Sequence, residues 1–257
     1  MGSKILVIGI DAATWSVIDK NLDRLKTFKM LKDSDDFNRK TLTLDQKPYS
    51  APCWASMFTG KTEEEHGHHE FVINNEIQTR KDIKADFIWD ILDREGKKVK
   101  ALNVPFIVPP YNFNIEFKAP GMGVPTTRDE WDAEIEKVTK KSIETLEKKE
   151  LDLFITCYVS LDKIQHMHWG GSIVDEYYEK IDEAIGKLLR FGEKIIIASD
   201  HGFCAFGDAK VQTLPKVTSN GSKLRGDHHE DAILITKGIK KEINNLRDVF
   251  KAVKEEV

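Results

Sequence analysis

Short apolar runs recur along the chain, separated by segments with helical periodicity. The runs are rich in Ile, Val and Leu, which is typical of strands buried on both faces of a sheet. They occupy residues 5–10, 98–104, 153–159, 194–198 and 232–236. Helices are predicted at residues 15–28, 51–58, 87–93, 128–150, 174–189 and 241–257.

Strands that alternate with helices predict right-handed crossovers and therefore a mostly parallel sheet flanked by helices. We expect one α/β domain over residues 1–257, since the chain contains no linker, repeat or low-complexity tract. Residues 105–125 hold five of the eight prolines and are predicted to form a surface loop. This loop could shape a binding site or simply connect two elements. A small cap, if one exists, has room only within residues 105–150.

Composition narrows the classes of protein. The formal net charge of −4, with Lys and Glu scattered over the helices, argues against a nucleic-acid-binding surface. No apolar segment reaches the roughly 18 to 20 residues that span a membrane. The N-terminal residues lack the core of a signal peptide, so we expect a cytoplasmic protein. Three widely spaced cysteines predict reduced packing residues rather than disulfides or a thiolate zinc site: Cys53, Cys157 and Cys204.

Three apolar runs end close to an aspartate, namely Asp11, Asp162 and Asp200. The carboxyl ends of parallel strands meet at one edge of a sheet, where ligand sites form. His201 follows Asp200 directly, and His166 lies four residues after Asp162, which places both side chains on one helical face. Taken singly, each aspartate also fits a structural role, as a helix cap, a turn cap or half of a surface ion pair.

All eight histidines fall in four short segments, at residues 66–69, 166–168, 201 and 228–229. Imidazole together with carboxylate is a ligand set for zinc, manganese or iron, and paired metals of this kind catalyse in-line phosphoryl displacement. Three carboxylates and three histidines would supply two such sites.

Ser50 is a candidate nucleophile because it opens a predicted helix that carries Pro52 in its first turn. The N-terminus of a helix favours an anion, and a hydroxyl bound to a divalent metal is easily deprotonated and can attack phosphorus. The alternative is that Ser50 only caps the helix.

The segment Ser-Ala-Pro-Cys-Trp-Ala-Ser-Met-Phe-Thr-Gly at residues 50–60, followed by His66-Gly67, resembles the nucleophile segment of a known family. This is the type I phosphodiesterase and nucleotide pyrophosphatase family of the alkaline phosphatase superfamily. The resemblance extends over nearly the whole chain, through the ordered set Asp11, Ser50, Asp162 with His166, Asp200 with His201, and Gly226-Asp227-His228. Residues 103–105, Asn-Val-Pro, are similar to a segment of uncharacterised prokaryotic members.

The resemblance implies a single alkaline-phosphatase-like domain that holds two divalent cations, Zn²⁺ or alternatively Mn²⁺. It implies that Ser50 is the catalytic residue and forms a phosphoserine intermediate with a small phosphoester substrate, such as a nucleotide. One metal would be held by Asp162, His166 and His228, and the other by Asp11, Ser50, Asp200 and His201.

Several positions leave the resemblance incomplete. Phe71 stands where the nucleotide pyrophosphatases have an Asn that contacts a phosphate oxygen, which leaves the nucleotide preference open. His228 is chosen over His229 because the Gly-x-His pattern precedes a strand. His68 and His69 fall outside the metal pattern and could line a pocket or a solvated loop. The connection between His201 and His228 is too short to hold a large specificity cap. This implies either a small substrate or a pocket that a second copy of the chain completes.

Alternative functions remain at this stage. Residues 50–52, Ser-Ala-Pro, also resemble the start of the sulfatase motif. That motif continues with Ser-Arg after its proline, whereas Cys53-Trp54 follows here, which argues against a sulfatase. A phosphomutase or phosphomonoesterase of the same superfamily would carry a larger inserted domain than this chain can hold. A non-catalytic protein that binds metal and phosphate is the remaining class. We therefore expect a metal-dependent phosphoester hydrolase of the phosphodiesterase type.

Overall fold

The structure is a computed structural model that describes residues 1–105, 115–218 and 221–257. Its strands are β1 (Gly2–Ile10), β2 (Phe37–Thr43), β3 (Val72–Ile73), β4 (Glu76–Ile77), β5 (Val99–Leu102), β6 (Glu150–Tyr158), β7 (Gly192–Ala198), β8 (Gly202–Ala205), β9 (Gly226–His229) and β10 (Asp231–Lys237). Its α-helices are α1 (Trp15–Lys20), α2 (Lys26–Asp33), α3 (Ser50–Thr59), α4 (Glu63–His66), α5 (Ile88–Arg94), α7 (Arg128–Lys148), α8 (Ser160–His168), α9 (Ser172–Leu188) and α10 (Leu246–Glu256). Short 3-10 helices are η1 (Arg80–Asp82), η2 (Pro120–Gly123) and η3 (Leu189–Phe191).

The central sheet has six strands in the order β2-β10-β7-β1-β6-β5. Strands β7, β1, β6 and β5 run parallel, and Val7 of β1 lies opposite Ile155 of β6 on one side and Ile196 of β7 on the other. Strand β10 is antiparallel to both β7 and β2. The predicted mostly parallel α/β sheet is confirmed. The antiparallel edge is an addition, because an apolar run carries no information about strand direction.

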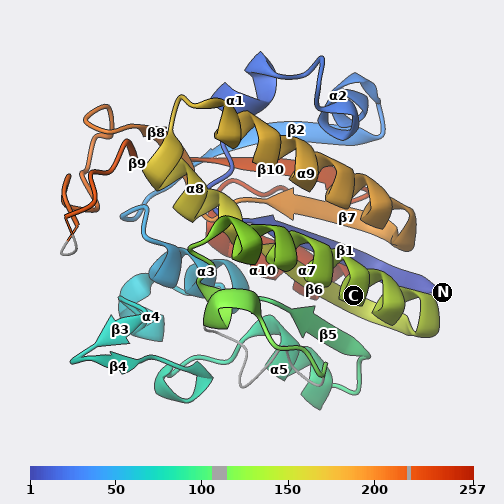
Figure 1. Cartoon of the computed structure of the whole chain (residues 1–257). Coiled ribbons are helices and arrows are strands. Elements are labelled where there is room, and N and C mark those ends of the chain that lie inside the picture. Colours follow the sequence, from blue (N-terminus) through green and yellow to red (C-terminus); the bar gives the residue numbers. More distant parts are fainter. Residues whose placement is uncertain (106–114, 219–220) are drawn as a thin grey trace.

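Helices cover both faces of the sheet (Figure 1). Helices α1, α2, α7, α8 and α9 pack on one face, and α3, α5 and α10 pack on the other. Successive residues of β1 point to opposite faces, so Leu6 and Ile8 join the first core while Ile5 and Val7 join the second. Burial on both faces explains why the strands are continuously apolar in sequence.

The predicted elements differ from the structure in a few places. The helix predicted at residues 15–28 is α1, a turn and the start of α2, which continues to Asp33. Where α1 ends, the side-chain amide of Asn21 donates to the Val17 carbonyl (3.0 Å). Helix α10 begins at Leu246 rather than at residue 241, with Asn245 as its N-cap. Strand β2 was not predicted, because it lies at the sheet edge and only Leu42 in it is fully buried. The short strands β8 and β9 were also missed.

The region predicted as a loop and cap is only partly described. Residues 106–114 lie outside the described residues, and the part that follows contains η2. Helix α7, which falls within residues 105–150, packs against β6 and α9 and therefore belongs to the helical layer of the sheet. Any cap would have to come from the residues before α7, and it stays a prediction.

Two further expectations concern composition. In the part of the chain that the structure describes, no helix is long and apolar enough to cross a membrane. Cys53, Cys157 and Cys204 are free thiols, as predicted, and the first two are buried.

Candidate active site

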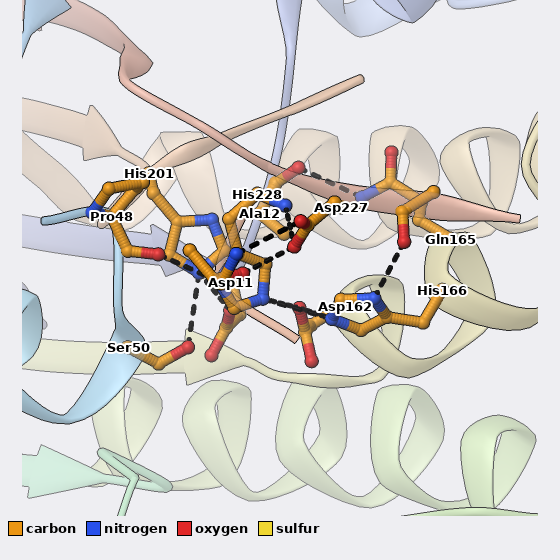
Figure 2. Close-up of polar contacts among 12 residues, drawn as sticks. Asp11, Ala12, Pro48, Ser50, Asp162, Gln165, His166, His201, Asp227 and His228 are labelled. Atoms are coloured by element: carbon orange, nitrogen blue, oxygen red, sulfur yellow. Dashed lines mark hydrogen bonds and ion pairs between the residues drawn. The ribbon is translucent and has the colours of Figure 1, made fainter. Parts of the chain in front are cut away.

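The seven predicted site residues converge where β7, β1 and β6 end. Figure 2 labels all of them except Asp200. These three strands are neighbours in the sheet, so the side chains that follow them are brought together. The residues are Asp11, Ser50, Asp162, His166, Asp200, His201 and His228. All are buried except Asp162, which is partly exposed.

The first group consists of Asp162, His166 and His228. Oδ1 of Asp162 lies 3.1 Å from Nε2 of both histidines, and the two Nε2 atoms are 2.9 Å apart. Nδ1 of His166 donates to the Gly226 carbonyl (3.0 Å), and Nδ1 of His228 donates to the Pro48 carbonyl (2.7 Å). Because a carbonyl oxygen only accepts, Nδ1 carries the hydrogen and each neutral ring turns a lone pair on Nε2 into the group.

The second group surrounds His201. Its Nε2 lies 3.0 Å from Oγ of Ser50, 3.3 Å from Oδ2 of Asp200 and 3.7 Å from Oδ1 of Asp11. Its Nδ1 donates to the Gly202 carbonyl (2.9 Å), so this ring is oriented in the same way as the other two. Ligand atoms of Asp11, Asp162 and His201 all lie within 4.8 Å of one another. Asp162 is therefore within reach of both groups, which the sequence did not indicate.

The second group has the chemistry of a cation site. Oδ1 of Asp11 and Oδ2 of Asp200 are buried and have no hydrogen-bond partner among the residues that the structure describes. Burial, together with the charges of Asp200 and Asp162, holds the pKa of Asp11 well above its usual range, and burial raises the pKa of Asp200 to about 8. Buried carboxylates that repel one another become stable as anions when a cation lies between them.

The first group fits a cation for a different reason. Burial and the neighbouring His201 lower the pKa of His228 to about 4, which keeps this ring in the neutral form that binds metals. Burial opposes ionisation of Asp162, whereas a proton held between it and the two imidazoles favours the carboxylate and holds the pKa of Asp162 well below its usual range; a cation would take the place of that proton. Two imidazole lone pairs and a carboxylate thus face one point.

Helix α3 positions Ser50. Tyr49 is the N-cap of this helix and Ser50 is its first residue, so the interpretation of Ser50 as only a cap is wrong. Nε1 of Trp54, one turn further along α3, donates to Oδ2 of Asp11 (3.1 Å). This contact depends on Gly9 in β1, where a Cβ atom would lie 2.6 Å from the Trp54 ring.

The other structural alternatives are also wrong. The N-cap of α1 is Thr14, not Asp11. Asp200 is fully buried, and besides the N–H groups of its own turn its carboxylate accepts a hydrogen bond from the Ala12 N–H (3.2 Å) after the neighbouring strand, so it is more than a local turn cap. Asp162 and His166 lie on one face of α8, as the spacing predicted, but His166 is buried and the pair is not a surface ion pair.

Sequence reasoning missed Asp227. This buried carboxylate accepts hydrogen bonds from the N–H groups of His228 (2.9 Å) and Thr213 (3.0 Å). It thereby ties the connection between β8 and β9 to the strand that carries His228. Its place between a glycine and a histidine in the motif was a signal, but its partner Thr213 cannot be identified from spacing.

The remaining histidines do not join either group. Nε2 of His66 lies 3.1 Å from Oγ of Ser56. The buried His68 ring lies 5.9 Å from the ring of Phe71, whereas the exposed His69 pairs with Glu63. Nδ1 of His229 accepts a hydrogen bond from the Asp231 N–H (3.1 Å). The geometry therefore favours His228 over His229 as the ligand.

Known proteins resemble this chain in sequence pattern and in fold. The family model for type I phosphodiesterase / nucleotide pyrophosphatase matches residues 5–256. No curated protein matches the sequence at a significant level.

Solved structures of similar fold cover almost the whole chain. Phosphonoacetate hydrolase from Sinorhizobium meliloti 1021, solved with phosphonoacetate, shares 13% identity over 99% of this chain and 96% of its own, with a TM-score of 0.71. An inactive form of murine ectonucleotide pyrophosphatase/phosphodiesterase 5, solved with AMP, shares 13% identity over 99% of this chain and 94% of its own, with a TM-score of 0.69. A variant of TAB5 alkaline phosphatase, solved with Mg, shares 11% identity over 100% of this chain and 98% of its own, with a TM-score of 0.61.

Proposed function

Because the chain belongs to the type I phosphodiesterase/nucleotide pyrophosphatase family, we propose that it is a phosphoester hydrolase that depends on two divalent cations. The family membership confirms the resemblance drawn from the sequence. The observation that carries the proposal is the convergence of the Ser50 hydroxyl with two groups of buried carboxylates and imidazoles. The proposed reaction is hydrolysis of a phosphodiester or a nucleotide pyrophosphate.

The two groups would each hold one cation. Asp162, His166 and His228 form the first site, and Asp11, Ser50, Asp200 and His201 form the second. Imidazole and carboxylate ligands favour Zn²⁺, with Mn²⁺ as the alternative, and the Mg in the alkaline phosphatase of similar fold supports a divalent ion. When bound, such cations lower the pKa of a serine hydroxyl and offset the charge that develops on a transferred phosphoryl group.

Ser50 would carry the covalent chemistry. Its Oγ forms a bond to phosphorus while the bond to the leaving oxygen breaks, and water then cleaves the phosphoserine. In the first turn of α3, Pro52 has no N–H and the Cys53 N–H donates to the Tyr49 carbonyl, whereas the Ala51 N–H has no partner within the helix and would bind a phosphoryl oxygen. The burial of Ser50 and His201 limits the access of competing water.

The substrate would be a small phosphoester. The AMP complex of the mammalian enzyme supports a nucleotide, whereas Phe71 in place of the expected Asn removes a contact to a phosphate oxygen and leaves the nucleotide preference open. A single domain over residues 1–257, a cytoplasmic location and a pocket completed by a second copy of the chain stay predictions.

The test is hydrolysis of bis-p-nitrophenyl phosphate by the metal-free protein after addition of Zn²⁺ or Mn²⁺. We expect Ser50→Ala to lower the rate by at least about 10³-fold, because the nucleophile is lost. Ser56→Ala is the matched control, since Ser56 is a buried serine of the same helix whose hydroxyl bonds to Gln46 and His66. Equal rates for Ser50→Ala and the unsubstituted protein would refute the mechanism.

Other substrates and a binding measurement separate the alternative functions. Faster turnover of p-nitrophenyl phosphate than of the diester would indicate a monoesterase. Isomerisation of phosphoglycerate without release of phosphate would indicate a mutase. Cation and phosphate binding without hydrolysis of any ester would indicate a non-catalytic protein.

A further inference from the structure

Gln165 lies on α8 between Asp162 and His166, yet its side chain bonds to the turn that follows β1 (Figure 2). Its Nε2 donates to the Ala12 carbonyl (2.8 Å), and its Oε1 accepts from the Tyr178 hydroxyl (3.1 Å). The same hydroxyl accepts from the Thr14 N–H (3.0 Å). Both side chains are fully buried, so these bonds form a closed network away from solvent.

The turn held by this network orients the second group. Ala12 has a φ of 62°, a left-handed conformation that L residues rarely adopt without support from their surroundings. In this conformation the Ala12 N–H donates to Oδ1 of Asp200 (3.2 Å), which leaves Oδ2 turned toward His201. Asp11 immediately precedes Ala12, so the same turn also fixes where its carboxylate lies.

We propose that Gln165 and Tyr178 are positioning residues for the second cation site, and that through α8 they couple it to the first. The inference rests on the proposed function, since it requires cations at both groups. Asp162 and His166 are one helical turn apart, so a cation held by both immobilises the segment of α8 that contains Gln165. The Ala12 turn then loses less conformational entropy when the second cation binds, so the first cation raises the affinity for the second. By linkage, the second cation raises the affinity for the first by the same factor.

Two substitutions test the network to different extents. Gln165→Met keeps the volume but removes both polar atoms, so the Ala12 carbonyl loses its contact. Tyr178→Phe removes one hydroxyl and leaves the bond from Gln165 to Ala12. Tyr158→Phe is the matched control, because its buried hydroxyl bonds to Oγ1 of Thr139 (2.8 Å) and does not contact the turn.

The measurement is calorimetric titration of the metal-free full chain with Zn²⁺, with each group isolated in turn. His228→Ala disables the first group, and Asp200→Ala disables the second. In the His228→Ala background we expect Gln165→Met to weaken Zn²⁺ binding by about 10-fold or more, the usual effect of losing a residue that orients ligands. In the Asp200→Ala background we expect a change below about 2-fold.

Coupling is read from the protein with both groups intact. There Zn²⁺ should bind the second group more tightly than in His228→Ala, and Gln165→Met should reduce this difference. Tyr178→Phe should give a smaller loss in the same direction, and it carries the test if Gln165→Met does not fold. Tyr158→Phe should leave both affinities unchanged even where it lowers the melting temperature to a similar extent.

The outcomes distinguish this inference from the proposed function. If the unsubstituted protein binds no Zn²⁺, the proposed function is wrong and the coupling falls with it. If it binds Zn²⁺ but Gln165→Met and Tyr178→Phe leave the second group unchanged, only the positioning role is wrong. Equal weakening of both groups, or the same loss in Tyr158→Phe, would also overturn it, because either result indicates general destabilisation.

Discussion

Glu134 is a fully buried carboxylate of α7 that supports the start of the ligand-bearing helix α8. Its Oε1 accepts hydrogen bonds from the side-chain amide of Asn103 (2.8 Å) and from the Val159 N–H (3.1 Å). Its Oε2 accepts from the Ser160 hydroxyl (2.8 Å). Val159 and Ser160 are the N-cap and first residue of α8, so the charge state of Glu134 bears on the placement of this helix.

Two effects compete at this carboxyl group. Burial disfavours the anion, whereas the hydrogen bonds from Ser160, Val159 and Asn103 favour it. The effect of burial is the larger of the two, and it raises the pKa of Glu134 to about 7. We therefore predict that Glu134 makes the stability of the protein depend on pH near neutrality.

The sign and size follow from proton linkage. Between pH 4.5 and about 7 the folded state keeps a proton on Glu134 that the unfolded chain releases. The contribution to the free energy of unfolding is complete below this window and is lost as the pH rises through it. At about 1.4 kcal/mol per pKa unit, the loss is roughly 3 kcal/mol.

Glu134→Gln isolates this effect, because the amide does not titrate. Urea unfolding of both metal-free proteins, followed by tryptophan fluorescence and circular dichroism between about pH 5 and pH 8, gives the two free energies. The difference between them, unsubstituted protein minus variant, should fall by about 2.5 kcal/mol from pH 5 to pH 8, because the contributions of the other titrating groups cancel. Glu136→Gln, which removes an exposed carboxylate from the same helix, should give a flat difference.

The result that refutes this reasoning is also clear. A difference that stays constant over this range would mean that burial and hydrogen bonding balance. A difference that rises with pH would mean that the donors at the start of α8 outweigh burial and hold Glu134 ionised.

Three further predictions follow from the site. Removal of cations with EDTA should lower the free energy of unfolding by about 2.7 kcal/mol for each site at which the free cation was at a hundred times its Kd. A melting temperature that changes neither with EDTA nor with Zn²⁺ or Mn²⁺ added back would contradict the cation sites. Gly202→Ala would place a Cβ atom 2.1 Å from the Asp231 carbonyl oxygen, so we expect a loss of roughly 2–3 kcal/mol in urea unfolding; a stable variant would show that the backbone there yields easily. Trp54→Phe removes the N–H that reaches Asp11 and should cost roughly 2 kcal/mol; an unchanged thermal midpoint would show that Asp11 finds another donor.

Local signals in the sequence predicted the parallel strands and the candidate ligands. Strands β1, β6 and β7 are buried on both faces, so their apolar runs could be recognised without any knowledge of their partners. Aspartates at the ends of such runs and clustered histidines indicated the candidate ligands, and the family resemblance selected among them and added Ser50, which gave the seven residues that the structure brings together. Strand β2 could not be predicted in this way, because at the sheet edge only Leu42 of its side chains is fully buried.

The residues that support the site were decided by tertiary structure alone. Nε1 of Trp54 reaches Asp11 across 43 positions of the chain, and Gln165 reaches Ala12 across 153. Helix period and strand burial depend on neighbouring residues, so a sequence determines them locally. Contacts between distant residues depend on how layers pack and where strands end. The sequence therefore determined which residues could bind cations, and the fold decided which carboxylates face one another and which side chains hold them there.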